Sequence, residues 1–278
     1  MVTSISRSLL YNCIPVEKVK IGLIGFGRFG RMTYEYLRRL KPLRVYDRSP
    51  DAVRDVPESA PLEEVASCPL IVLCVPISSM EETCLRLAPL LRRGQTVVDT
   101  CSVKSRPAEW MSALLPEDVQ ILGTHPLFGP DSGKAGISGL KIALCSVRIS
   151  SGTYQSICSC LSGLGLELIE TTPDEHDRQI ARSQAVFHLI AQTMKELDWG
   201  TQEITTPGPE AFYRLVGTVQ SDTPELFRDM ERENPYAPAW RQRFIEAAAK
   251  LDRALSDDRQ KFSQQDAPPK GESPSAKK

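Results

Sequence analysis

The sequence predicts an α/β domain followed by an all-helical domain. Three observations favour this division. A short apolar run at residues 19–24 leads directly into a glycine-rich segment at residues 25–30. Apolar runs of strand length then alternate with helical patterns as far as residues 171–172. From Asp174 onward, amphipathic helical patterns follow one another without a strand between them.

The glycine-rich segment has the spacing of a dinucleotide-binding turn. Three glycines in GxGxxG order follow the first strand and precede a helical pattern at residues 32–40, which is the context that this motif requires. Glycines there permit a tight turn and a close approach of the backbone to a pyrophosphate. We therefore predict a Rossmann-type dinucleotide-binding domain over residues 18–171. The expected contacts in the turn are Gly25, Phe26, Gly27, Arg28, Phe29 and Gly30.

The residues after the second strand, at 43–46, indicate which dinucleotide binds. Asp47 follows that strand, and its carboxylate would accept hydrogen bonds from ribose hydroxyls and repel a 2′-phosphate. This favours NAD. Arg48 and Ser49 keep NADP open, because a guanidinium beside a hydroxyl also suits a 2′-phosphate, although Arg48 equally fits a solvated loop charge.

The α/β alternation continues through the rest of the first domain. The expected strands lie at residues 70–75, 96–98, 119–122, 140–145 and 166–169, and the expected helices lie at residues 79–91 and around 154–161. Val75 and Pro76 close the first of these strands, at the sheet edge where a cofactor lies. The segment after Asp99, residues 100–104, opens a further helix at the same edge.

A single histidine, His125, follows the strand at residues 119–122 on a segment stiffened by Gly and Pro, residues 123–133. Ligands of open α/β sheets lie beyond the carboxyl ends of the strands, so we expect this side chain to face the crevice rather than the core. A structural histidine that caps the strand end is the open alternative.

The second domain consists of helical patterns at residues 174–197, 209–219, 223–232 and 239–256. Their apolar faces need partners, so we expect residues 172–263 to form a helical domain that makes a homodimer. Residues 264–278 are rich in Pro, Ser and Lys without periodicity, and we expect a disordered tail there.

Composition and cysteine spacing exclude several other classes. A net charge of −1 leaves no basic surplus for a nucleic acid, and the chain has no run of about 18 apolar residues that would span a membrane. The eight cysteines lack the spacing of a zinc site or a disulfide framework, so we expect buried thiols, no metal and a cytoplasmic location. Residues 1–15 lack the features of a signal peptide, and residues 1–17 are interpreted as an N-terminal extension.

Three motifs contain all three histidines of the chain. They are DTCSVK at residues 99–104, HPLFGPDSG at residues 125–133 and EHDRQIARSQAVFH at residues 175–188. Together they resemble the prephenate and arogenate dehydrogenase family, which carries out the last oxidative steps toward tyrosine. The resemblance extends over residues 19–262.

The resemblance implies an oxidative decarboxylation of a cyclohexadienol. Hydride leaves C4 for NAD or NADP while carbon dioxide leaves C1, and aromatisation drives the reaction. His125 matches the family's catalytic histidine, which accepts the C4 hydroxyl proton as a neutral imidazole. Ser102 matches the family serine that contacts the hydroxyl and the imidazole; a helix N-cap would be its purely structural role.

The resemblance also implies substrate contacts from the helical domain. Gln184 and His188 stand four residues apart, hence on one helix face, and in the family that face contacts the substrate. His188 also fits a core histidine with one partner, because its neighbours are apolar. His176, beside Asp177 near the helix N-terminus, is interpreted as mostly structural.

The segment TVQSDTPELF at residues 218–227 favours arogenate as the substrate. Many bacterial family members carry an Arg shortly before the proline equivalent to Pro224, where it binds the ring carboxylate; here Arg214 is out of register. The segment resembles the plant-type branch, in which an acidic residue aligned with Asp222 is associated with arogenate. A carboxylate pairs with the ammonium of arogenate and disfavours the keto acid of prephenate. Asp222 also fits the N-cap of the helix that begins at Thr223.

Thr206 resembles a plant-type segment that approaches the site, which makes it a further candidate for substrate binding. Prephenate dehydrogenation to 4-hydroxyphenylpyruvate is the alternative reaction. A β-hydroxyacid dehydrogenase would need a catalytic lysine on the long helix, where Lys195 lies past the expected active-site face. A non-catalytic dinucleotide sensor would leave Ser102, His125 and Gln184 without a joint purpose.

Overall fold

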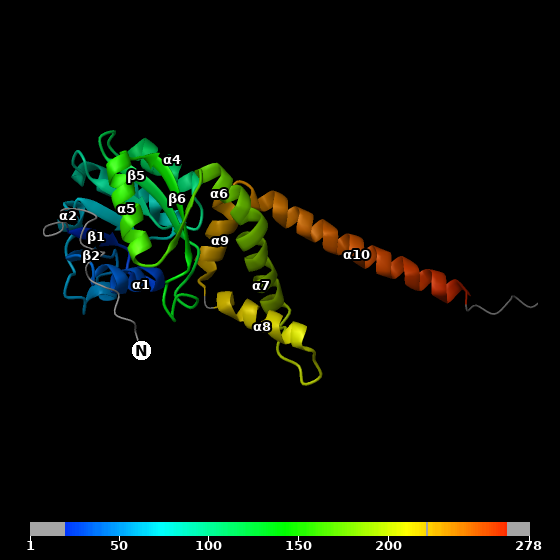
Figure 1. Cartoon of the computed structure of the whole chain (residues 1–278). Coiled ribbons are helices and arrows are strands. Elements are labelled where there is room, and N and C mark those ends of the chain that lie inside the picture. The colour runs from blue at the N-terminus through cyan, green and yellow to red at the C-terminus, as the bar shows by residue number, and fades with distance from the viewer. Residues whose placement is uncertain (1–19, 221, 266–278) are drawn as a thin grey trace, which may run out of the picture.

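The structure, a computed structural model, describes residues 20–220 and 222–265. A seven-stranded sheet forms the first part of this region, and a group of helices follows it on one side (Figure 1). The change from strands to consecutive helices falls at residues 171–172, between the last strand and the first of those helices. Among the described residues, none of the helices is long and apolar enough to cross a bilayer.

The sheet has the strand order β2-β1-β3-β4-β5-β6-β7. Its strands are β1 (Ile21–Ile24), β2 (Leu43–Tyr46), β3 (Leu70–Leu73), β4 (Thr96–Asp99), β5 (Gln120–Pro126), β6 (Lys141–Arg148) and β7 (Glu167–Glu170). All neighbouring strands pair in parallel except β5 and β6, which are antiparallel. The predicted α/β class is confirmed: this is a Rossmann-like sheet followed by a helical region.

Helices cover both faces of the sheet. These helices are α1 (Arg28–Leu37), α2 (Leu62–Ala66), α3 (Met80–Leu87), α4 (Ser105–Leu114) and α5 (Ser151–Gly163). Buried side chains of α2, α3 and α4 form one core cluster with β3 and β4, while α1 and α5 contribute to clusters on the other face. Both faces of the central strands are therefore covered, which explains their continuous apolar runs.

His125 lies inside strand β5, and the expectation that it follows the strand on a loop is wrong. Parallel pairing with β4 ends where Asp99 stands opposite Gly123. The antiparallel partner β6 continues the pairing and places Ala143 opposite His125. Pairing with β6, a later segment of the chain, thus extends β5. The Gly and Pro residues after Leu122 therefore predicted the end of the strand too early. The histidine is buried, with 3% of its surface exposed.

The second part of the chain begins with one long helix interrupted by a wide turn. Residues Ala181–Ala185 form a π turn between α6 (Pro173–Ile180) and α7 (Val186–Glu196). Such turns insert an extra residue and are frequent at functional sites. The remaining helices are α8 (Pro207–Gln220), α9 (Pro224–Glu233) and α10 (Ala237–Gln265).

Helix α10 projects away from the rest of the molecule (Figure 1). It includes residues 264 and 265, which the sequence assigned to a disordered tail; residues 266–278 and the extension 1–17 lie outside the described part. Several large apolar side chains on this helix are exposed: Phe244, Ile245, Leu251 and Leu255. Although α10 contacts α7 and α9, these side chains are not covered by any other described part of the chain.

Seven cysteines lie within the described residues, and all seven are free thiols. Four of them are buried: Cys68, Cys84, Cys101 and Cys145. Cys74, Cys158 and Cys160 are partly exposed, so the expectation of buried thiols holds for four of the seven. Cys13 lies outside the described residues.

Candidate functional site

The glycines of the turn after β1 serve two different purposes. A side chain on Gly30 would meet the carbonyl oxygen of Gly25 at 2.1 Å, and one on Gly25 would meet the carbonyl oxygen of Cys74 at 2.3 Å. Gly25 also has a φ of 95°, which glycine adopts without strain. A side chain on Gly27 would meet nothing within 4 Å of the described atoms. Gly25 and Gly30 therefore permit close packing, while Gly27 leaves open space.

A cavity of about 240 Å³ opens beside this turn. Its lining includes six residues that the sequence predicted as cofactor contacts: Gly25, Gly27, Asp47, Arg48, Val75 and Pro76. It also includes residues that the sequence did not single out, among them Tyr46, Ser79, Thr83 and Arg86. The lining joins the carboxyl ends of β1, β2 and β3, where nucleotides bind in sheets of this type.

Asp47 fixes the geometry of this cavity from the end of β2. One oxygen of its carboxylate accepts a hydrogen bond from the backbone N–H of Phe26 at 2.7 Å, and the other accepts one from the N–H of Ser49 at 2.8 Å. Each oxygen keeps further acceptor capacity, because a carboxylate offers about four lone-pair sites. The group thus suits ribose hydroxyls.

The first turn of α1 presents backbone N–H groups at the same place. Gly27 precedes the helix, and no described side chain caps it. Uncapped N–H groups and the helix dipole favour a phosphate there. Phe26 is buried in the core, whereas Arg28 is exposed and Phe29 is half-buried on the first helical turn. The chemistry of this turn therefore fits the pyrophosphate of a dinucleotide.

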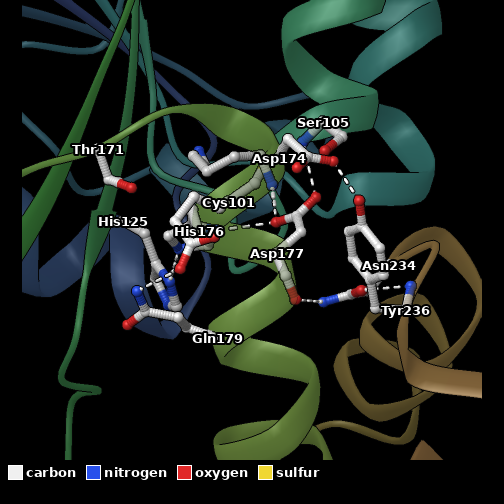
Figure 2. Close-up of polar contacts among 12 residues, drawn as sticks. Cys101, Ser105, His125, Thr171, Asp174, His176, Asp177, Gln179, Asn234 and Tyr236 are labelled. Carbon is white, nitrogen blue, oxygen red and sulfur yellow. Dashed lines mark hydrogen bonds and ion pairs between the residues drawn. The ribbon is translucent and has the colours of Figure 1, made fainter. Parts of the chain in front are cut away.

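Two histidines and a carboxylate form a buried chain at the carboxyl end of β5 (Figure 2). Nδ1 of His125 lies 2.9 Å from Nε2 of His176, and Nδ1 of His176 lies 2.8 Å from Oδ1 of Asp177. His176 and Asp177 belong to α6, so the chain joins the helical region to the sheet. The interpretation of His176 as mostly structural missed this contact, because only the fold brings it to His125.

The hydrogen-bond partners assign the protons along this chain. The carboxylate of Asp177 also accepts hydrogen bonds from the backbone N–H groups of Lys104 and Ser105, at 2.7 and 2.8 Å. An ionised carboxylate can only accept, so Nδ1 of His176 carries a proton and its Nε2 accepts from Nδ1 of His125. In the neutral ring of His125, Nε2 is then left with a lone pair. This is the nitrogen that a base needs.

Burial lowers the pKa of His125 well below its ordinary value, and nearby His176 and Lys104 lower it further. All three causes disfavour a positive charge on the ring of His125. The imidazole is therefore neutral around pH 7 and ready to accept a proton.

Asp177 also caps α4, a helix that packs on the sheet. Its two hydrogen bonds from Lys104 and Ser105 satisfy N–H groups at the start of α4. The alternative that Ser102 is the N-cap is therefore wrong: the helix begins at Ser105, and a carboxylate from α6 takes the capping role. Ser102 itself is half-buried in the loop after β4, and its contact with a substrate stays a prediction.

The side chain of Lys104 ties this loop to β5. It is buried with 1% of its surface exposed, forms an ion pair with Asp99, and donates to the carbonyl oxygen of Thr124 at 2.5 Å. Thr124 directly precedes His125, and Ser102 lies in the same loop as Lys104. The hydrogen bond from Lys104 to Thr124 thus joins the two segments that bear the predicted catalytic residues.

Asp222 lies between α8 and α9, close to groups from two other segments. Its carboxylate is 4.0 Å from Nη1 of Arg28 and 4.0 Å from Nε2 of His188. The N-cap alternative for Asp222 is wrong, because the hydroxyl of Thr223 accepts the hydrogen bond from the N–H of Leu226. His188 is buried, and burial lowers its pKa to about 4, so the ring is neutral.

Two further predicted substrate contacts, Gln184 and Thr206, belong to the helical region. Gln184 is half-buried within the π turn, and its contact with a substrate stays a prediction. Thr206 is exposed and precedes α8. Its described contacts, with Thr205 and Glu210, do not reach the site.

Comparison with known proteins agrees with this geometry. Residues 49–141 match the family model described as "Prephenate dehydrogenase, nucleotide-binding domain". Two chloroplastic enzymes of Arabidopsis thaliana are similar: arogenate dehydrogenase 2 at 33% identity over 79% of this chain, and arogenate dehydrogenase 1 at 31% over 82%. The chain belongs to the prephenate and arogenate dehydrogenase family. It spans 65% and 38% of the length of these two relatives.

Solved structures support the fold. Prephenate dehydrogenase of Aquifex aeolicus, in complex with hydroxyphenyl propionate and NAD+, aligns with a TM-score of 0.70 at 18% identity, over 89% of this chain and 94% of its own. Arogenate dehydrogenase of Synechocystis aligns with a TM-score of 0.60 at 23% identity, over 89% of this chain and 97% of its own. Both sheet and helical regions are therefore those of this fold.

The two kinds of glycine allow a test of the dinucleotide turn. Gly30→Ala should lower the free energy of unfolding by about 1–3 kcal/mol, because the new methyl group displaces the backbone of Gly25. Gly27→Ala should leave thermal stability unchanged and weaken NAD binding by at least about tenfold, because the methyl group fills space intended for the ligand. Thermal denaturation and calorimetric titration with NAD measure both effects. Full NAD affinity in Gly27→Ala would place the pyrophosphate elsewhere.

Proposed function

We propose that this protein is an NAD-dependent arogenate dehydrogenase that forms tyrosine by oxidative decarboxylation. The buried chain from His125 through His176 to Asp177, at the sheet edge that bears the dinucleotide cavity, is the observation that carries the proposal. It provides a neutral base beside the place where a nicotinamide would lie. The plant relatives bear the name arogenate dehydrogenase.

The cofactor site fits NAD in its residues. The turn Gly25–Gly30 would hold the pyrophosphate, and the carboxylate of Asp47 would bind the adenosine ribose. Arg48 and Arg86 line the same cavity and are the groups that would bind a 2′-phosphate if NADP is used. When bound, the nicotinamide accepts a hydride.

His125 removes the proton in the proposed reaction. Its Nε2 accepts the proton of the C4 hydroxyl, which makes that oxygen more electron-rich and favours departure of hydride from C4. The bond between C1 and the ring carboxylate breaks and carbon dioxide leaves. The electron pair of that bond stays on the ring and completes its aromatic system. His176 receives the hydrogen bond from Nδ1 of His125 throughout, and it thereby keeps Nε2 as the nitrogen that accepts the proton. Ser102 is proposed to hold the substrate hydroxyl.

The substrate would lie against the helical region. His188 presents a buried neutral ring, and the carboxylate of Asp222 lies 4.0 Å from it. We assign Asp222 to the side-chain ammonium of arogenate, since it is not used as a helix cap. Gln184 is proposed as a further substrate contact from the π turn. Prephenate, which lacks the ammonium, is the poorer substrate on this assignment.

Other activities fit the residues less well. Lys195 is exposed near the end of α7, so it does not supply the catalytic lysine of a β-hydroxyacid dehydrogenase. A dinucleotide sensor has no use for a buried imidazole whose Nδ1 is held by a buried partner, so that Nε2 is the proton acceptor. We also propose a reducing compartment, the cytoplasm, because the described cysteines are free thiols. The plant relatives are named chloroplastic.

Removal of the base should slow turnover strongly and leave ligand binding intact. His125→Asn should lower kcat for arogenate by about 10²- to 10⁴-fold, the usual contribution of a general base. Steady-state assays of NADH formation and calorimetric titration with tyrosine measure the two properties. Undiminished formation of tyrosine by His125→Asn would refute the assignment.

A matched variant tests the role of His176. His176→Gln should raise the pKa of His125, because it removes one of the groups that lower it. The acid limb of the profile of kcat/KM against pH should therefore move to higher pH. A merely structural role would reduce activity equally at every pH and leave the limb in place.

Asp222 should decide between the two substrates. Asp222→Asn should lower the ratio of kcat/KM for arogenate to that for prephenate by about tenfold or more, because the loss of the negative charge weakens ammonium binding and relieves repulsion of the keto acid. The ratio is measured on the same preparation with both substrates. An unchanged ratio would show that a group other than Asp222 discriminates between the side chains of the two substrates.

We further propose that the helical region forms a homodimer. The exposed apolar residues of α10 provide a face that needs a partner, and a second copy of the chain presents the same face. Sedimentation velocity should give about twice the chain mass of 30.9 kDa. Replacement of Leu251 and Leu255 by Glu should yield monomers; a monomeric unmodified chain would contradict the proposal.

A further inference from the structure

We propose that Arg28 and Asp222 together recognise the amino acid end of the substrate, with Arg28 binding the α-carboxylate and Asp222 the α-ammonium. The inference rests on the proposed function and assigns a specificity role to a residue of the dinucleotide turn. The sequence placed Arg28 among the cofactor contacts.

The side chain of Arg28 does not point toward the proposed adenosine cavity. That cavity is lined by Gly25 and Gly27 but not by Arg28. The guanidinium instead reaches the loop after β5: its Nη2 donates to both carboxylate oxygens of Asp131, at 2.8 and 2.9 Å. Asp131 follows His125 in the chain, so this contact fixes the guanidinium beside the segment that bears the proposed base.

The other end of the guanidinium faces Asp222. Nη1 of Arg28 and Oδ1 of Asp222 are 4.0 Å apart, which is beyond hydrogen-bond distance but close enough for electrostatic attraction. The second oxygen of Asp222 is 4.0 Å from His188, the buried residue assigned to the substrate. Opposite charges thus stand side by side where three segments meet: the first turn of α1, the loop after β5, and the junction of α8 and α9.

A pair of opposite charges matches an α-amino acid, which presents a carboxylate and an ammonium on one carbon atom. The guanidinium offers N–H donors in a planar fork that suits a carboxylate, and the Asp222 carboxylate accepts from an ammonium. Because Asp131, Asp222 and Arg28 together carry one excess negative charge, the cluster favours a zwitterion over a keto acid, which is purely anionic. Arogenate carries the zwitterion and prephenate the keto acid.

Three ligands that share a phenol ring separate the two charges. Tyrosine carries both groups, 3-(4-hydroxyphenyl)propionate carries only the carboxylate, and tyramine carries only the ammonium. Each is titrated calorimetrically into the full-length protein saturated with NAD, for the unmodified chain and for Arg28→Gln, Arg28→Lys and Asp222→Asn. Arg38→Gln is the matched control, because it removes the same charge just beyond the far end of α1.

Arg28→Gln should weaken binding of tyrosine and of the propionate by about 10- to 100-fold and change tyramine by less than about threefold. Asp222→Asn should weaken tyrosine and tyramine by a similar factor and leave the propionate at least as tightly bound. Arg28→Lys should retain part of the affinity for both carboxylates, and Arg38→Gln should match the unmodified chain. Affinity for NAD, titrated alone, should stay within about twofold in all variants.

The outcomes separate this inference from the proposed function. If the unmodified chain oxidises arogenate but Arg28→Gln affects all three ligands equally, or weakens NAD itself, Arg28 serves the cofactor and the inference is wrong while the function stands. If the unmodified chain neither oxidises arogenate nor binds tyrosine, both fall. Thermal denaturation confirms that each variant is folded; the exposed position of Arg28 makes its replacement tolerable.

Discussion

One buried carboxylate, that of Asp177, connects the two parts of this protein. It accepts hydrogen bonds from the backbone at the start of α4 and from the ring of His176. A fully buried negative charge is tolerated only when donors surround it, and here each donor comes from a segment that must be correctly folded. The same interaction therefore docks α6 on the sheet and sets the proton on His176.

The chemistry of His125 follows from that constraint. Because His176 accepts the hydrogen bond of His125, the opposite nitrogen of His125 is the one available to a substrate. Burial keeps the ring neutral, and the ion pair of Lys104 with Asp99 holds the neighbouring loop and strand in place. The second carboxylate oxygen of Asp99 is buried and has no hydrogen-bond partner among the described residues.

Binding and chemistry are distributed over different segments. The end of β2 and the turn after β1 supply the dinucleotide cavity, and β5 supplies the proposed base. The junction of α8 and α9 brings Asp222 to the first turn of α1, and α9 is anchored beside the cavity by hydrogen bonds from Ser78 to Asp229. A site assembled in this way depends on how the helical region docks, so residues remote from the substrate control its geometry.

The sequence by itself determined the fold class, the dinucleotide turn and the family. Those features rest on local patterns: an apolar strand before glycines, an acidic residue after the next strand, and motifs around the histidines. Tertiary structure decided the rest. Strand β5 extends through His125 because β6 pairs with it, Asp177 caps a helix far away in the chain, and a π turn at Ala181–Ala185 interrupts the predicted long helix. Each of these three features depends on a partner distant in sequence or on a change of helical period. The local spacing of residues predicts neither the partner nor the change of period.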